Sequence, residues 1–233
     1  QVGDLTAFIT YSMVIVMGFL MLTMISIMLP RAGVAADRIV EVLDTPISLH
    51  DPERTKDALL EQPKGYVTFQ DVSFTYPDAD EPALSHISFT AEPGKTTAII
   101  GSTGCGKSTI VRLIPRFFDV TQGAVRIDGV DVREMSQNKL RSLMGYVPQK
   151  GVLFSGTIES NLKYGGENIS DADMQQAADI AQATEFIDSK VDRYNSLISQ
   201  GGTNVSGGQK QRLSIARAIA KHPKIYLFLC TGL

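Results

Sequence analysis

The sequence predicts an α/β domain that follows a single membrane-spanning helix. Three observations support this fold class: a long apolar run near the start, an alternation of strand and helix patterns from residue 65 onward, and a glycine-rich stretch ending in Gly-Lys-Ser. The 233 residues suffice for one domain of ordinary size with a smaller addition. We expect three parts: a membrane helix with its cytosolic extension over 1–45, a linker over 46–64, and the α/β domain over 65–233.

The apolar run from Leu5 to Leu29 predicts a transmembrane α-helix, because it contains no charged residue. At a rise of ~1.5 Å per residue the run would reach ~37 Å, longer than the ~30 Å hydrocarbon core. A buried core helix or a signal peptide are the alternatives, but a signal peptide has a basic leader and a shorter apolar centre, whereas Asp4 precedes this run. Arg31 and Arg38 follow it, so the positive-inside tendency places the rest of the chain in the cytosol.

The segment after the apolar run predicts a continued helix and then a linker. Pro30 does not obviously end the helix, because a helical apolar spacing continues through Val34, Ile39 and Val42. The polar stretch 46–64 contains three prolines and is typical of a linker. The chain has no initiator Met, so we expect it to begin within a longer, multi-pass membrane protein.

Strand and helix patterns alternate in the rest of the chain. β-branched and aromatic residues predict six strands, at 66–76, 86–91, 95–101, 124–129, 143–149 and 224–228. Helical patterns are predicted at 110–114, 174–183 and 207–221. Ser170 and Asp173 form a predicted capping box for the second of these helices. This order indicates a partly parallel sheet with packed helices.

The charge balance and the cysteine count exclude several classes of protein. There are 22 basic and 25 acidic residues, a net charge of −3, so no basic surplus indicates a nucleic-acid partner. Two cysteines, Cys105 and Cys230, are too few for a disulfide framework, which fits a reducing cytosol.

The stretch GSTGCGKST matches the pattern G-x-x-x-x-G-K-[ST] and predicts a nucleotide phosphate site. Small residues allow backbone N–H groups to surround a phosphate, and the following helix turns its positive end toward it. Lys107 would reach the β- and γ-phosphates, and the Ser108 hydroxyl would bind Mg²⁺. A chance match in a chain of this length is on the order of one in a hundred. The candidate residues are Gly101, Ser102, Thr103, Gly104, Cys105, Gly106, Lys107, Ser108 and Thr109.

A second candidate phosphate site is VSGGQ, residues 205–209. One interpretation is a glycine turn in which Ser206 only caps the following helix. The other is an anion site, since the helix N-terminus offers free amides. Two phosphate sites in one chain are expected when each nucleotide lies between two chains.

The motifs GSTGCGKST, YVPQ and VSGGQKQRLSIARA, in this order, resemble the nucleotide-binding domain of an ATP-binding cassette (ABC) transporter. With a membrane helix directly in front, the chain is similar to the C-terminal part of exporters, specifically bacterial multidrug or lipid-type half-transporters. The resemblance covers residues 5–228. It implies a P-loop NTPase fold with a helical subdomain, ATP and Mg²⁺ as cofactors, and a cell-membrane location with this domain in the cytoplasm.

The resemblance also implies partners and residue roles. The partners would be a second exporter subunit, in a homo- or heterodimer, membrane lipid, and a substrate carried by membrane helices that this chain lacks. Tyr76 would stack on adenine, the alternative being an ordinary tyrosine of the sheet. Gln149 would touch Mg²⁺ or the attacking water, the alternative being a plain loop glutamine. Residues 200–204 would contact the cytoplasmic ends of membrane helices. Four residues would act on a nucleotide that the partner subunit holds: Ser206, Gly207, Gly208 and Gln209.

The chain departs from the family after its last predicted strand. The family has an Asp there that supports Mg²⁺, followed by a Glu that orients water, whereas this sequence has Leu229 and Cys230. Nor does any of His50, His86 and His222 follow that strand, where the family has a switch histidine. We therefore expect a frameshift or a fragment boundary, with ATP binding retained and hydrolysis impaired. The alternatives are a binding-only product of a broken gene and, with less support, a soluble ABC-type ATPase of DNA maintenance.

Overall fold

The computed structural model describes residues 2–77, 79–166 and 168–229. The chain divides into two compact units between His50 and Asp51. Each unit is described by itself below.

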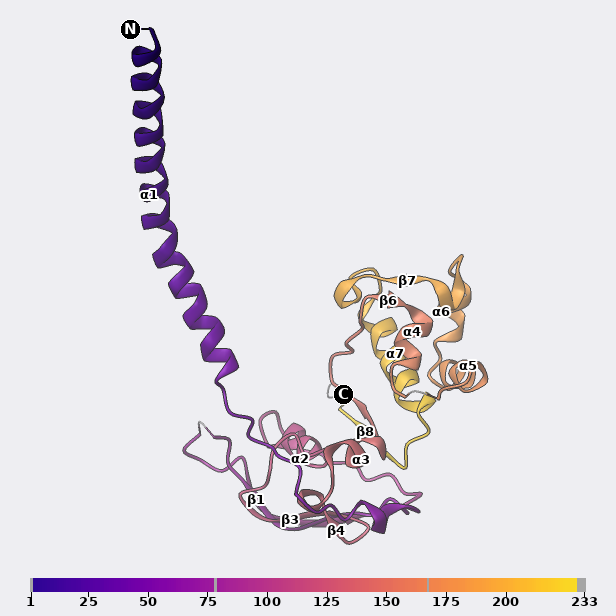
Figure 1. The fold of residues 1–233 in the computed structure, drawn as a ribbon. Helices are drawn as coiled ribbons and strands as arrows, with labels where there is room; N and C mark the ends of the chain where they lie inside the picture. Colours follow the sequence, from indigo (N-terminus) through magenta and orange to yellow (C-terminus); the bar gives the residue numbers. More distant parts are fainter. Residues whose placement is uncertain (1, 78, 167, 230–233) are drawn as a thin grey trace. The chain divides into compact units, whose positions relative to one another are not determined.

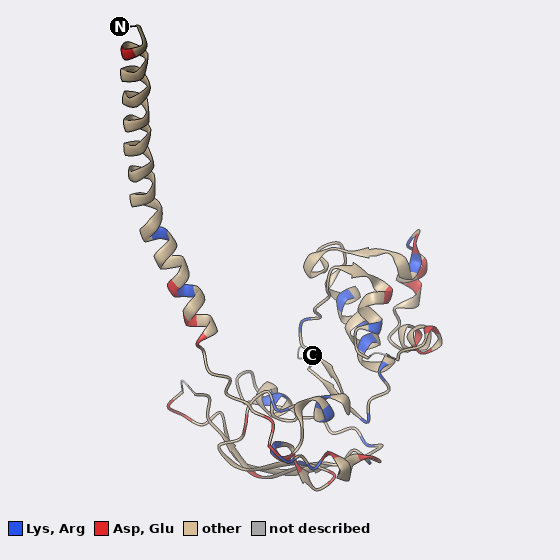
Figure 2. Ribbon diagram, in the orientation of Figure 1, with Lys and Arg blue, Asp and Glu red and all other residues tan. Residues whose placement is uncertain are grey.

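The first unit contains one long helix, α1, from Val2 to Leu43 (Figure 1). It passes through Pro30 without a break, which confirms the continuation predicted from the apolar spacing. None of its residues is buried, and no charged residue lies between Asp4 and Arg31 in the sequence. Figure 2 shows the corresponding long uncharged stretch of the helix in tan. The helix is long and apolar enough to cross a membrane.

The second unit begins with a four-stranded antiparallel sheet in the order β2-β1-β3-β4 (Figure 1). β1 alternates buried and less buried residues at each end, with a bulge near Asp71 between. Gly123 faces this bulge, and a Cβ there would lie 2.3 Å from the carbonyl oxygen of Asp71, so only glycine fits. The strand bounds are β1 Val67–Phe74, β2 Leu84–Ala91, β3 Gln122–Ile127 and β4 Val130–Asp131.

Two further strand pairs complete the described sheet structure. β5, Met144–Val147, is parallel to β8, Ile225–Phe228, with Val147 opposite Phe228. β6, Gly156–Thr157, is antiparallel to β7, Leu197–Ile198. Because β5 and β8 are parallel, the residues that follow them meet at one sheet edge.

The helices of the second unit separate into two groups with separate cores. The sheet, β5, β8, α2 and α3 share one apolar core, which includes Phe69, Leu113 and Leu140. α4, α5, α6 and α7 share another, which includes Leu162 and Leu213. The bounds are η1 Asp57–Leu60, α2 Lys107–Leu113, η2 Val132–Glu134, α3 Gln137–Ser142, α4 Ile158–Lys163, α5 Asp171–Ile180, α6 Thr184–Asp188, η3 Arg193–Asn195, η4 Gln200–Gly202 and α7 Gly207–Ala220.

The predicted strand at 95–101 is wrong. Residues 95–101 have no strand structure, and the side chain of Ile100 is 92% exposed. An extended segment needs a neighbouring strand to satisfy its backbone groups, and no strand within the described residues pairs with it. The phosphate loop is therefore reached through a segment without regular secondary structure.

The second half of the predicted linker packs against the α/β unit. Leu60, in η1, is 1% exposed and belongs to the first core. The Asp57 carboxylate accepts hydrogen bonds from the backbone N–H of Ser136 at 3.0 Å and from its hydroxyl at 2.6 Å. Asp51 accepts a hydrogen bond from the N–H of Gln137 at 3.0 Å. The segment from Asp51 to Leu60 is therefore held at the start of α3, and we call it the linker clasp.

Candidate functional site

The phosphate loop is shaped by a glycine at the start of α2. Gly106 precedes the helix with φ +88°, a conformation that favours glycine. A Cβ at this position would lie 2.7 Å from Cδ2 of Leu84 and 3.0 Å from the carbonyl oxygen of Ala83. The positive φ and the close approach of Ala83 and Leu84 together favour glycine at this position.

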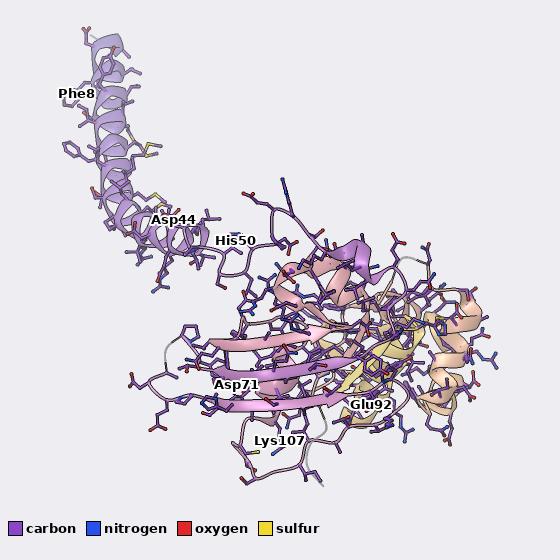
Figure 3. The ribbon with its side chains drawn as sticks, turned by 90° about the horizontal axis from the view of Figure 1, so that it is seen from below. Phe8, Asp44, His50, Asp71, Glu92 and Lys107 are labelled. Atoms are coloured by element: carbon purple, nitrogen blue, oxygen red, sulfur yellow. The ribbon has the colours of Figure 1, made fainter. Side chains whose placement is uncertain are left out.

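Lys107 lies against the backbone of the loop that it follows. Its Nζ donates hydrogen bonds to the carbonyl oxygens of Gly101 at 2.7 Å and Ser102 at 2.6 Å. The same nitrogen is 3.6 Å from Sγ of Cys105. Figure 3 shows Lys107 beside the loop that projects from the sheet. The loop thus curls around one ammonium group.

The groups around this loop fit a phosphate. The backbone N–H groups of Gly106, Lys107 and Ser108 have no hydrogen-bond acceptor within the described residues. Together with the ammonium of Lys107, they form a set of donors at a helix N-terminus, which is the arrangement that binds phosphate oxygens. The chemistry of these groups fits the triphosphate of ATP.

Tyr76 contacts Thr109, which ends the phosphate loop and lies in the first turn of α2. Its hydroxyl is 3.0 Å from Oγ1 of Thr109, which is on the first turn of that helix. Its ring meets the rings of Phe74 and Phe118 nearly at right angles, at 79° and 84°. Tyr76 follows β1, which ends at Phe74, so it is not a residue of the sheet. The contact with Thr109 is one that sequence reasoning missed, because no local pattern joins the two residues.

Gln149 and Leu229 lie near the same sheet edge. Gln149 is exposed and follows β5 by two residues, while Leu229 follows β8 directly. The backbone N–H of Leu229 donates to the carbonyl oxygen of Val147 at 3.0 Å. Leu229 therefore occupies the position at which the family resemblance predicts an acid. Cys230, the next position of interest, lies outside the described residues.

The described residues offer Mg²⁺ few ligands. The two predicted metal ligands, Ser108 and Gln149, are neutral, whereas Mg²⁺ sites usually include one or two carboxylates. Within the described part of the chain no group of three or more His, Cys, Asp or Glu residues could hold a metal ion. These side chains fit Mg²⁺ only as supplements to the oxygens of a bound triphosphate.

The Ser206–Gln209 turn caps α7 and leaves its first amides open. The Ser206 hydroxyl accepts a hydrogen bond from the N–H of Gln209 at 3.3 Å, and the Gln209 side chain accepts one from the N–H of Ser206 at 2.9 Å. Ser206 is therefore the N-cap of α7, which is compatible with both interpretations of this turn. A Cβ on Gly207 or Gly208 would meet nothing within 4 Å, so this helix end is an open surface with a positive dipole.

Arg217 ties α7 to the segment that follows Gln149. Its guanidinium donates to the carbonyl oxygen of Asn161 at 2.8 Å and to that of Val152 at 3.0 Å. It also lies over the rings of Phe154 and Tyr164, at 5.4 and 5.9 Å from their centroids. Burial lowers the pKa of Arg217. In the sequence, Arg217 stands among the regularly spaced apolar residues of α7, and this position is what indicates that its side chain packs against other residues.

Comparisons with known proteins agree with the motifs. A sequence-family profile described as ABC transporter matches residues 84–228. An uncharacterized ABC transporter ATP-binding protein of Mycobacterium tuberculosis is 49% identical over 231 residues, which are 98% of this chain and 39% of the relative. An ATP-dependent lipid A-core flippase of Saccharophagus degradans is 41% identical over 218 residues, 94% of this chain and 36% of the relative.

A solved structure has the same fold. The structure of a bacterial Atm1-family ABC exporter with ATP bound matches this chain with a TM-score of 0.76 and 36% sequence identity, over 84% of this chain and 34% of that one. The chain thus spans less than half the length of the relatives that it matches. The α/β unit has the P-loop NTPase fold of ABC nucleotide-binding domains. On the matched profile and these relatives, the chain belongs to the ABC transporter family.

Proposed function

We propose that this chain is the ATP-binding part of an exporter subunit in a cell membrane. The phosphate loop of Gly101–Thr109 would bind the triphosphate, Tyr76 would contact adenine, and α1 would be one of several membrane helices in the whole protein. The flippase among the relatives supports a lipid-like or other amphipathic substrate. A second subunit would complete the nucleotide site.

The observation that carries the proposal is the arrangement around Lys107. Its ammonium group, open amide donors at the start of α2, and Tyr76 are gathered around one helix N-terminus. A triphosphate would take over the hydrogen bonds that Lys107 now makes with Gly101 and Ser102. Adenine binding would use Tyr76, whose hydroxyl contacts Thr109 of that helix.

The Ser206–Gln209 turn supports a site shared between two subunits. The phosphate loop belongs to the first core and this turn to the second. We propose that the open amides of Gly207 and Gly208 bind the γ-phosphate of a nucleotide held by the partner subunit. Ser206 retains its hydroxyl proton for the same phosphate, because the described hydrogen bond uses the hydroxyl only as an acceptor.

We further propose that hydrolysis by this chain is slow. Magnesium, when bound, neutralises charge on the transferring phosphate. Among the described residues, the candidates to support the metal and the water are the neutral groups Ser108 and Gln149, and Leu229 stands at the end of β8. Without a positioned acid, the reaction loses roughly 10²–10⁴-fold in rate.

The test compares three forms of the chain in detergent micelles: the wild type, Lys107→Ala, and a repaired form. The repaired form carries Leu229→Asp, Cys230→Glu and the C-terminal segment of the mycobacterial relative. We expect the wild type to bind Mg-ATP, and Lys107→Ala to bind it about ten-fold more weakly or worse, because charge-assisted hydrogen bonds are lost. Phosphate release should be fast only in the repaired form.

Two outcomes would contradict the proposal. Equal ATP affinity in the wild type and Lys107→Ala would remove the phosphate loop as the binding site. Rapid, Lys107-dependent hydrolysis by the wild type would show that another residue supplies the missing acid.

A further inference from the structure

We infer that Thr109 is a positioning residue whose hydroxyl holds the ring of Tyr76 at a fixed position relative to the phosphate loop. The inference rests on the proposed ATP site and adds a residue that determines how strongly the adenine base contributes to binding. The hydroxyl–hydroxyl contact of 3.0 Å carries it.

Thr109 differs from the helical threonines of α1 in its hydrogen bonding. Thr6, Thr10 and Thr23 each donate to the carbonyl oxygen four residues earlier, at 2.8–3.0 Å, which is the usual partner of a threonine within a helix. In the described part of the chain Thr109 makes no such bond, and its hydroxyl pairs with Tyr76 across 33 residues of sequence. The residue is 7% exposed, so water does not readily replace this partner.

The backbone around Tyr76 lacks the support of a sheet. β1 ends at Phe74, and the next described strand begins at Leu84. The ring of Tyr76 is placed by three side chains instead: Phe74 and Phe118 at 4.8 and 5.3 Å between centroids, and Thr109 at the hydroxyl. The two phenylalanines are apolar, so they pack against the ring without a hydrogen bond to its hydroxyl. Thr109 is the one polar contact that fixes its direction among the described residues.

This contact links base recognition to phosphate recognition. Thr109 lies two residues after Lys107 on α2, so the helix that carries the phosphate ligand also carries the anchor of Tyr76. The separation between ring and phosphate loop is therefore set by one short rigid element. Loss of the Thr109 hydroxyl should loosen the ring and weaken the binding of ATP more than the binding of a phosphate chain that lacks the base.

The experiment measures the affinity of the full chain for ATP and for inorganic tripolyphosphate, which lacks the base. We expect Thr109→Val and Tyr76→Phe each to weaken ATP about two- to ten-fold, the range for one net hydrogen bond. Thr109 also belongs to the phosphate loop, so Thr109→Val should weaken ATP more than tripolyphosphate, whereas Tyr76→Phe should leave tripolyphosphate affinity unchanged. In the ratio of ATP affinity to tripolyphosphate affinity, the double variant should match either single variant, because both remove the same contact. Thr109→Ser keeps the hydroxyl and should restore both affinities.

Two further variants calibrate the result. Tyr76→Ala removes the stacking ring and should weaken ATP by about ten-fold or more, since base–aromatic stacking is worth ~1–3 kcal/mol. Thr90→Val is the matched control, because it breaks a hydroxyl pair with Thr68 at 3.3 Å between β1 and β2. It should change neither affinity.

The outcomes separate this inference from the proposed function. A chain that binds neither ligand in a Lys107-dependent way would contradict the proposed function itself. Lys107-dependent ATP binding that is the same in Thr109→Val as in the wild type would overturn only the inference. Equal weakening of ATP and tripolyphosphate would also overturn it, because Thr109 would then act on the phosphates or on folding.

Discussion

At the scale of single residues, Cys105 provides a thiol in the phosphate loop that a chemical reagent can modify. Its thiol is exposed, and Sγ lies 3.6 Å from Nζ of Lys107 and 2.5 Å from the position of a Cβ on Gly101. The sulfur therefore lies within the turn that would surround a phosphate. A group added to it would compete for the same space.

We predict that ATP protects Cys105 from a bulky maleimide. In a Cys230→Ser background, where Cys105 is the remaining cysteine of the chain, labelling should be fast without nucleotide and slow with saturating Mg-ATP. Mass spectrometry of the intact chain gives the labelled fraction over time. In Lys107→Ala the protection should require about ten-fold more ATP or worse. Equal labelling rates with and without ATP would contradict this placement, and absence of labelling in both would indicate a thiol buried by the fold.

At the scale of elements, the linker clasp connects the segment before the α/β unit to the start of α3. Asp57 bonds to the residue that caps this helix, Ser136, whose hydroxyl also accepts from the N–H of Lys139 at 3.2 Å. Lys56 adds an ion pair with Glu134 at 2.7 Å, but both side chains are about half exposed, so it contributes little. α3 leads into β5, which ends two residues before Gln149. The linker is thus attached to the elements that place Gln149.

We predict that Asp57→Ala lowers the free energy of unfolding by about 1–2 kcal/mol, because two donors of Ser136 lose their acceptor. Burial alone would raise the pKa of Asp57, but hydrogen bonds from Ser136 outweigh it and lower the pKa below the ordinary 3.8. The stabilisation is therefore complete at neutral pH and is lost as pH falls through the folded-state pKa, below about 3.8. Urea unfolding followed by circular dichroism at pH 7 and below pH 4 measures both effects.

Glu61→Ala is the control for the linker clasp, since Glu61 is exposed and makes no described hydrogen bond. Its unfolding midpoint should match that of the wild type. The proposal of a clasp would be wrong if Asp57→Ala were as stable as this control at pH 7.

Elements that depend on local patterns are the ones that the sequence predicts correctly. The alternation at 66–76 gives β1, and the predicted capping box of Ser170 and Asp173 is present at the start of α5. Contacts between distant residues could not be predicted in this way. The apolar stretch at 95–101 has strand composition but no neighbouring strand in the described chain, and Asp57 is 79 residues from Ser136.

The candidate site also has parts that local sequence patterns predict and parts that they do not. The motif alone predicts the loop, because Gly106 has the positive φ of +88° that favours glycine, a local property of the chain. The position of Tyr76 came only from the family resemblance, since its partner Thr109 is 33 residues away and carries no sequence signal. The family resemblance also gives the roles of Gln149 and Ser206–Gln209, which stay predictions.

At the scale of the whole molecule, the two predicted phosphate-binding elements belong to different cores. Ile110 and Leu113 anchor α2 in the first core, whereas Leu213 and Ala216 anchor α7 in the second. Each element is thus packed in a different apolar cluster of the same unit. A site built from both elements is therefore suited to form between two subunits.

We predict that Gly208→Glu in the repaired form keeps ATP binding and loses hydrolysis by about 10²-fold or more, as expected when charge stabilisation of a transition state is removed. The substitution has room, because a Cβ on Gly208 meets nothing within 4 Å, but its carboxylate would repel the γ-phosphate of the partner's nucleotide. Nucleotide titration and phosphate release are measured on the same preparation. Gln175→Glu adds the same charge to an exposed position of α5 and should leave both unchanged. A parallel loss of binding in Gly208→Glu would argue that one chain uses both elements on its own nucleotide.

Because Lys107 already donates hydrogen bonds to its own loop, a nucleotide must replace these acceptors in order to bind. The ammonium group is already held by two carbonyl oxygens of its own loop, so an incoming triphosphate competes with an internal ligand. The apparent dissociation constant is then the intrinsic constant divided by the fraction of molecules whose loop is open. Any change that frees Lys107, such as a partner that draws Gly101 away, would raise affinity without touching the nucleotide. Occupancy of the loop would in this way depend on the state of the surrounding protein as well as on the concentration of ATP.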